Sequence, residues 1–216
     1  MAIQTINGAE STDATTLLGT DAADTIAVSQ ESNVFATGKA AGDEFTFAAA
    51  AETATVKGGA GDDTVDFDKS VTSSFVNGNA GADSINFEST VTSSSLFGGI
   101  DDDNFVIDGE IATTTIRGNE GDDTFEFNDK FNDSFLNGNQ GDEDITIDDG
   151  TSGSTIMAGI GDDTVSLGGT VSTTTVKGDD GNDDINITGS IGSKSLVNGN
   201  KGDDDIDVTG ETKAGS

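Results

Sequence analysis

One short repeat runs through almost the whole chain and limits the folds that the chain can adopt. Its best-formed copy, GGAGDDTVDF, begins at Gly58 and ends at Phe67. The first position of the repeat recurs at Gly19, Gly38, Gly58, Gly78, Gly98, Gly118, Gly138, Ala158, Gly178 and Gly199. The step from Gly58 to Gly78 is the usual one, and it is one residue shorter near the start and one residue longer near the end. Repeats of this length predict a stack of similar structural units rather than one globular core.

Apolar residues occupy fixed columns of this repeat. The eighth and tenth positions are apolar, as at Val65 and Phe67, and so is the position two residues before the first glycine, as at Val56. Alternation over two residues is typical of β-strands, in which successive side chains point to opposite faces. A further apolar column, in the opposite half of the unit, contains Val71, Val91, Ile111, Phe131, Val171 and Ile191. The 30 glycines and the frequent β-branched residues disfavour helix.

Each unit is therefore predicted to contain a strand, a Gly-rich turn, a second strand and a Ser/Thr-rich return. We predict an all-β protein, a right-handed parallel β-solenoid (β-roll) of about ten 20-residue coils at residues 17–208. Residues 1–16 are assigned to an N-terminal cap or junction segment and residues 209–216 to a C-terminal tail. Small residues are expected to fill the narrow side of the coils: Ala54, Ser74, Ser94, Thr114 and Ser134. With strands about 4.8 Å apart, the rod is on the order of 50 Å long.

The composition restricts partners and location. Of 216 residues, 41 are acidic and 9 are basic, so the net charge is −32 at pH 7. With 32% hydrophobic residues, such a charge is also typical of disordered chains, but the regular apolar columns favour a fold. So acidic a surface disfavours nucleic acid and anionic membranes as partners. We expect no transmembrane segment, and residues 1–18 lack the pattern of a signal peptide, so any export is expected to need no cleaved N-terminal signal.

The sixth position of the repeat is acidic in every coil, as at Asp63. Stacking places these carboxylates in file, where neighbours repel each other by ~1 kcal/mol per pair even in water. A second acidic column runs alongside: Asp62, Asp102, Asp122, Asp142, Asp162 and Asp203. Because basic residues are few and His and Cys are absent, we expect a hard cation from solution, with turn carbonyls and carboxylates suiting calcium better than magnesium. A solvated acidic face is the simpler alternative.

The turn itself is rich in residues that tolerate unusual backbone angles. Gly or Asn stands at the first two turn positions, as in Gly58-Gly59 and Gly78-Asn79. We expect positive φ angles there, which other residues resist.

These residues resemble the calcium-binding nonapeptide of RTX (repeats-in-toxin) proteins, G-G-x-G-x-D-x-U-x with U aliphatic. The segment from Gly58 to Asp66 fits the nonapeptide at every fixed position, and the resemblance extends over residues 17–208. It implies a β-roll that is secreted, folds on meeting external calcium, and binds the ion between neighbouring turns through carbonyls and the sixth-position acids. The implied calcium ligands are Asp24, Asp43, Asp63, Asp83, Asp103, Asp123, Glu143, Asp163, Asp183 and Asp204.

The chain departs from the family pattern in two ways. Each coil carries one motif rather than two, so we expect calcium along one edge of the solenoid only. In addition, Asp101 replaces the fourth-position glycine, Ala158 the first-position glycine and Glu143 the sixth-position Asp. Weaker calcium sites are expected at these three places.

Three functions compete. The first is non-enzymatic: an extracellular or cell-surface structural protein that self-assembles end to end into a filament or surface layer, or forms an adhesin stalk, because the repeat leaves open strand edges near both ends. The second is ice binding by outward threonine pairs such as Thr53/Thr55, although Phe75 and Phe135 interrupt that array. The third, a polysaccharide-acting β-helix enzyme, requires a base or paired catalytic carboxylates outside the repeat, and the chain has neither His nor Tyr.

Coils that stand three repeats apart resemble each other more closely than immediate neighbours do. The residue before the first-position glycine is in turn Lys57, Asn77, Phe97, Arg117, Asn137, Met157, Lys177 and Asn198. Phe97 with Ile100, and Met157 with Ile160, are expected to place apolar side chains beside the turn edge of an acidic rod. Duplication of a three-coil unit explains this period, and a lateral partner is the alternative, since exposed apolar patches often mark contacts.

Overall fold

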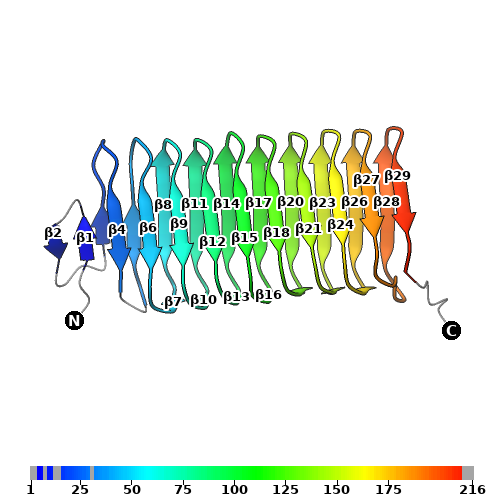
Figure 1. Ribbon diagram of the computed structural model, residues 1–216, viewed down its shortest axis with the longest axis horizontal. Coiled ribbons are helices and arrows are strands. Elements are labelled where there is room, and N and C mark those ends of the chain that lie inside the picture. Colours follow the sequence, from blue (N-terminus) through cyan, green and yellow to red (C-terminus); the bar gives the residue numbers. More distant parts are fainter. Residues whose placement is uncertain (1–3, 7–8, 12–15, 30–31, 211–216) are drawn as a thin grey trace.

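The computed structural model describes residues 4–6, 9–11, 16–29 and 32–210. Figure 1 shows an elongated stack of coils that follow one another along the long axis, from the N-terminal end to the C-terminal end. A typical coil contains β8 (Thr55–Ala60), a tight turn, β9 (Thr64–Phe67) and the short strand β10 (Val71–Thr72). No helix in the described part of the chain is long and apolar enough to cross a membrane.

The three strands of a typical coil belong to three different sheets. The pre-turn sheet has ten parallel strands: β3 (Thr16–Leu18), β5 (Phe35–Thr37), β8, β11 (Phe75–Ala80), β14 (Ser95–Ile100), β17 (Thr115–Glu120), β20 (Phe135–Gln140), β23 (Thr155–Ile160), β26 (Thr175–Asp180) and β28 (Leu196–Lys201). The return sheet, at the opposite edge from the turns, has seven two-residue strands: β7 (Ala51–Glu52), β10, β13 (Val91–Thr92), β16 (Ile111–Ala112), β19 (Phe131–Asn132), β22 (Thr151–Ser152) and β25 (Val171–Ser172).

The post-turn sheet is continuous from one end of the stack to the other. Its parallel strands are β4 (Thr25–Val28), β6 (Glu44–Phe47), β9, β12 (Ser84–Phe87), β15 (Asn104–Ile107), β18 (Thr124–Phe127), β21 (Asp144–Ile147), β24 (Thr164–Leu167), β27 (Asp184–Ile187) and β29 (Asp205–Val208). At the N-terminal end, β1 (Gln4–Ile6) pairs antiparallel with both β4 and β2 (Ala9–Ser11). This antiparallel pair extends the post-turn sheet beyond the repeat, whereas the pre-turn sheet begins at β3.

Neighbouring coils pair in a register that places each column of the repeat on itself. Val56 lies opposite Val76, and Val65 lies opposite Ile85. The predicted all-β, parallel, right-handed solenoid of about ten 20-residue coils is therefore confirmed. At the C-terminal end, Ile206 is 41% exposed, although Ile185, its counterpart one coil earlier, is fully buried.

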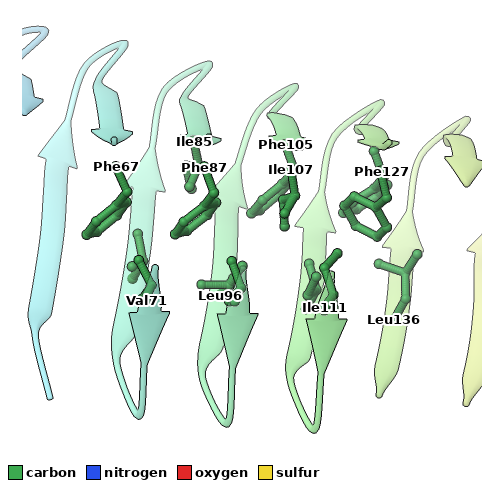
Figure 2. Packing of buried hydrophobic residues seen from close by; sticks show 14 of the residues in the cluster. Phe67, Val71, Ile85, Phe87, Leu96, Phe105, Ile107, Ile111, Phe127 and Leu136 are labelled. Carbon is green, nitrogen blue, oxygen red and sulfur yellow. The ribbon is translucent and has the colours of Figure 1, made fainter. Parts of the chain in front are cut away.

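The core is one side chain wide, because inward residues of the pre-turn and post-turn sheets meet directly. Figure 2 shows buried side chains such as Phe67, Phe87 and Leu96 repeating from coil to coil. The rings of Phe47 and Phe67 stack with centroids 4.4 Å apart, and those of Phe67 and Phe87 lie 4.8 Å apart. These distances are close to the spacing between neighbouring strands, so each ring stacks on the ring at the same position of the next coil. The core is built from such stacks and not from a thick globular interior.

The narrow side, between the return sheet and the next pre-turn strand, is filled by buried small residues as predicted. The backbone N–H of Ala54 donates to Ser74 Oγ at 3.0 Å, and that of Ser74 donates to Ser94 Oγ at 3.1 Å. Ser74 Oγ in turn donates to the Thr72 carbonyl at 2.9 Å. Similar bonds continue at Ser94, Thr114, Ser134, Ser154 and Thr174. Neutral hydroxyls therefore satisfy the buried N–H groups along this column, although the buried Thr151 hydroxyl of β22 has no partner.

Replacing Ser94 with alanine should destabilise the folded chain by roughly 1–3 kcal/mol, because the buried Ser74 N–H and Thr92 carbonyl both lose their Ser94 partner. Thermal unfolding in saturating calcium measures the change. Ala54→Ser is the matched control, because it adds a hydroxyl to the same column where none exists. We expect that control to be neutral or stabilising, and equal destabilisation by both variants would contradict the hydroxyl ladder.

Candidate metal centre

The structure brings the predicted acidic residues of the sixth column together in one file inside the turns. Nine of them, from Asp24 to Asp183, are at most 3% exposed, and Asp204 in the last coil is half-buried. This burial argues against a solvated acidic face, because a charged carboxylate is expensive to remove from water. No point among the described residues gathers three or more acidic side chains. The candidate centre is therefore a line with one acid per coil rather than a compact cluster.

Except at Asp24 and Glu143, one oxygen of each carboxylate takes part in a ladder along the file. The backbone N–H of Asp63 donates to Asp83 Oδ1 at 2.8 Å, and that of Asp83 donates to Asp103 Oδ1 at 2.8 Å. The same bond links Asp24 to Asp43, Asp43 to Asp63, Asp103 to Asp123, Glu143 to Asp163, Asp163 to Asp183 and Asp183 to Asp204. The acids therefore help to hold neighbouring coils in register.

The other oxygen points toward the glycine at the first position of the turn. A Cβ added at Gly58 would lie 2.2 Å from Asp63 Oδ2 and 2.6 Å from the carbonyl oxygen of Gly78. A side chain at this position would therefore collide with the acid, so the first-position glycine leaves room for it. The expectation of positive φ was wrong for this first position and right for the second, as at Asn79 with φ of 84°.

These inner oxygens are left without a hydrogen-bond donor. They are Oδ2 of Asp43, Asp63, Asp83, Asp103, Asp123, Asp163 and Asp183, with both carboxylate oxygens of Glu143. In the first coil the inner oxygen of Asp24, Oδ2, accepts the Thr20 N–H, and Oδ1 is the oxygen without a donor. A buried acceptor without a partner costs about 1–3 kcal/mol, and more when it is charged. The inner oxygen of Asp63 and the carbonyl oxygen of Gly78 border the same small space. Carboxylate and carbonyl oxygens form the donor set that calcium prefers, so the residues fit a hard cation.

Burial, reinforced by neighbouring carboxylates, raises the pKa of these acids. It raises the pKa of Asp63 to about 6, that of Asp83 to about 7 and that of Asp103, in the middle of the stack, to about 8. Burial also raises the pKa of Asp123 to about 7 and that of Glu143 to about 10, the latter with the Asp163 carboxylate close by. At neutral pH the file therefore resists full ionisation unless a cation compensates the charge.

The second acidic column behaves differently, because it lies on the outside of the turns. Its residues are exposed and accept hydrogen bonds from the next coil, as when the Asp122 N–H donates to Asp102 Oδ1 at 2.8 Å. This outer ladder runs opposite to the inner one and includes Asp62, Asp142 and Asp162. Of the two acidic columns in the described coils, the inner one alone has buried oxygens without donors, a difference that the sequence did not reveal.

The three departures from the repeat have visible structural effects. Asp101 adopts a φ of 80°, an angle suited to the glycine that it replaces. Ala158 is fully buried at a first position, where its methyl group occupies space that glycine leaves open in other coils. Glu143 breaks the inner ladder, since the described coils show no bond from the Asp123 N–H to its longer side chain. Weaker cation binding at these places stays a prediction.

Comparison with known proteins identifies the fold. No family model matches the sequence, and no curated protein sequence matches it either. A solved structure is similar: the X-ray crystal structure of a hyperactive, Ca2+-dependent, beta-helical antifreeze protein from an Antarctic bacterium. The TM-score is 0.66, with 17% sequence identity over 91% of this chain and 78% of that chain. At this identity the likeness shows a shared parallel β-solenoid fold.

The raised pKa values imply that protons can compensate the charge of the inner file in place of a cation. A carboxyl whose pKa is higher in the folded chain stabilises the fold most below its ordinary value near 3.8, and this contribution is lost as pH rises through about 6 to 8. We therefore expect the calcium-free chain to gain β-structure between pH 8 and pH 5. Far-ultraviolet circular dichroism of metal-free protein measures this. A spectrum that stays unchanged over this range would contradict the assignment of buried acids with raised pKa values.

Replacing Glu143 with aspartate should repair the inner ladder, because the shorter side chain can accept the Asp123 N–H as the other aspartates do. We expect about 1 kcal/mol of added stability, an increase of roughly 2–4 °C in the melting temperature, and a lower calcium midpoint. Calorimetry at fixed calcium measures the shift. Exposed Glu120→Asp is the matched control and should change nothing. A decrease in stability for Glu143→Asp would show that the longer side chain is preferred there.

Proposed function

We propose that this protein is a calcium-binding, extracellular structural rod that associates with itself, and that it is not an enzyme. The observation that carries the proposal is the file of buried carboxylate oxygens without donors inside the turns. A hard cation supplies both the missing charge and the missing contact for such oxygens.

The residues that would hold calcium are the sixth-column acids together with carbonyl oxygens of the first-position glycines. The stretch from Asp43 to Asp123 has an unbroken inner ladder, so we place the strongest sites there. The opposite edge is already satisfied by hydroxyl groups, as at Ser74 and Ser134. This contrast supports calcium along the turn edge only.

Calcium and folding should be coupled in this chain. A site assembled from successive coils does not exist in the unfolded chain, so binding energy contributes directly to folding. Extracellular calcium modules commonly bind with dissociation constants of about 10⁻⁴ to 10⁻³ M. A dependence of folding on calcium concentrations in this range supports a location outside the cell or on its surface.

Self-association is proposed from the ends of the pre-turn sheet. Its outermost strands among the described residues are β3 and β28, which present backbone groups that another copy can pair with. Ile206 also leaves apolar surface open at the C-terminal end. A structural rather than a catalytic role is supported because the buried acids belong to one repeated column rather than to a unique pair.

Ice binding is the second candidate, favoured by the antifreeze protein that shares the fold. The threonine pairs expected from the sequence do not form a flat array, because Thr53 sits at a corner with φ of 55° whereas Thr55 lies on β8. Phe75 and Phe135 interrupt the column of Thr55. Ice shaping or thermal hysteresis in calcium would replace the structural proposal, and we expect neither.

A calcium titration of the metal-free chain tests calcium-coupled folding. At pH 7.5 we expect a largely disordered far-ultraviolet spectrum without calcium and a β-rich spectrum at millimolar calcium, because Asp63, Asp83 and Asp123 are mostly ionised at this pH and the cation offsets their charge. Magnesium at equal ionic strength is the control and should be much less effective. A β-rich spectrum that persists in excess chelator at this pH would sink the claim that calcium drives folding.

A further inference from the structure

The outer face of the pre-turn sheet differs in charge from the rest of the molecule. Before these strands reach the turn, their two outward columns are those that contain Thr55 and Lys57. Acidic residues of the same strands, Glu120, Asp179 and Asp180, lie beyond these columns, beside the turn. In the described strands from β3 to β28, neither column contains an acidic residue, although the chain has 41. The columns carry instead three basic residues, Lys57, Arg117 and Lys177, each separated from the next by three coils.

These three cations have no partner of opposite charge within the described chain. The ion pairs there are Lys130 with Asp149 and Lys201 with Asp180. The Arg117 guanidinium lies 6.0 Å from the ring centroid of Phe97 and 5.7 Å from that of Phe135. It therefore makes cation–π contacts with one aromatic ring in each of the two neighbouring coils. Lys57 and Arg117 are exposed, and Lys177 is half-buried.

Apolar hollows lie between the cations with the same three-coil period. One hollow of about 330 Å³ is lined by residues that include Asn77, Phe97 and Ile100. A second, of about 350 Å³, is lined by their counterparts three coils later, Asn137, Met157 and Ile160, and on its turn side by Asp179 and Asp180. Ile100 is 50% exposed and Ile160 is 59% exposed, so each hollow leaves a large apolar side chain uncovered.

The outer face of the post-turn sheet is the opposite in charge. It lies on the other side of the rod, because the inward residues of the two sheets meet in the core. Its two outward columns are those of Thr64 and Asp66, and among the described strands they contain no basic residue. Their acidic residues are Glu44, Asp66, Glu126, Asp144, Asp184, Asp205 and Asp207.

We propose that the outer face of the pre-turn sheet binds the outer face of the post-turn sheet of a second copy, so that rods associate side by side. This lateral contact goes beyond the proposed self-association, because it uses the faces of the sheets and not their ends. The charges of the two faces are complementary. Each copy keeps one free face of each kind, so the contact is heterologous and extends into a layer.

A second copy is also the partner whose repeat matches this face along its whole length. Two identical rods have the same rise per coil, whereas a polymer with another repeat drifts out of step. With no axial shift, Lys57 and Asp66 belong to facing coils, as do Arg117 and Glu126. The hollow at Phe97 then faces the coil that contains Val106, the outward apolar residue of β15.

Charge reversal on each face tests the inference. One variant carries Lys57→Glu, Arg117→Glu and Lys177→Glu, a second carries Asp66→Lys, Glu126→Lys and Asp184→Lys, and a third carries all six substitutions. The matched control places three reversals on the return side: Lys69→Glu, Lys130→Glu and Lys194→Glu. Sedimentation velocity and negative-stain electron microscopy in millimolar calcium report the mass and the width of assemblies.

We expect wide assemblies from the unmodified chain and from the control, and at least tenfold weaker lateral association from either three-site variant. The six-site variant should recover lateral association, because both faces are reversed together. Wide assemblies from the first variant, or no recovery in the six-site variant, would overturn the inference. Assemblies one rod wide from the unmodified chain would overturn this inference and leave the proposed self-association intact. A chain that stays monomeric at high concentration would overturn both this inference and the proposed self-association, even if the monomer binds a polysaccharide.

Zero-length carbodiimide coupling gives an independent readout of the contact. It joins a lysine amine to a carboxylate only when the two groups touch. In an equal mixture of unlabelled and ¹⁵N-labelled chains, we expect mixed-isotope peptides that join Lys57 or Lys177 to acids of the post-turn face. Couplings confined to single chains, or to the acids of the turns, would contradict the proposed faces.

Discussion

Nine successive coils of this solenoid each bury one carboxylate inside the turn, and the rest of the structure depends on how that charge is compensated. One carboxylate oxygen accepts a hydrogen bond from a backbone N–H of the neighbouring coil, as Asp83 Oδ1 does from the Asp63 N–H. The other oxygen has no donor. The inner file therefore holds the coils in register and at the same time opposes folding, unless a cation or a proton offsets its charge.

The two edges of the rod solve the same problem with different chemistry. Both edges bury polar side chains that accept backbone N–H groups from the preceding coil. At the return side the acceptor is a hydroxyl, which also donates a hydrogen bond. The Ser74 hydroxyl therefore accepts one bond and donates another without carrying a charge. At the turn edge the acceptor is a carboxylate, which can only accept. This difference makes one edge independent of solution conditions and the other sensitive to pH and to divalent cations.

The repeat predicted the fold because its columns of Val, Ile and Phe specify strands, and the nearly constant step between first-position glycines specifies their parallel register. Several features depend on local space and were not predictable. The glycine at position 58 is needed because Asp63 occupies the place of its side chain, a contact invisible in the sequence. One extra methylene in Glu143 breaks the inner ladder. The antiparallel pairing of β1 with β4 lies outside the repeat, so no column indicated it.

The central claim is that cations belong inside the turns, next to the inner carboxylate oxygens. Crystals of the protein grown with calcium test it directly, by anomalous difference maps at a wavelength where calcium scatters. We expect a row of peaks beside the Oδ2 atoms from Asp43 to Asp123, with weaker peaks near Glu143 and Ala158. Peaks found only beside the outer column, at Asp102 or Asp122, or an ordered solenoid without any inner peak, would contradict the account.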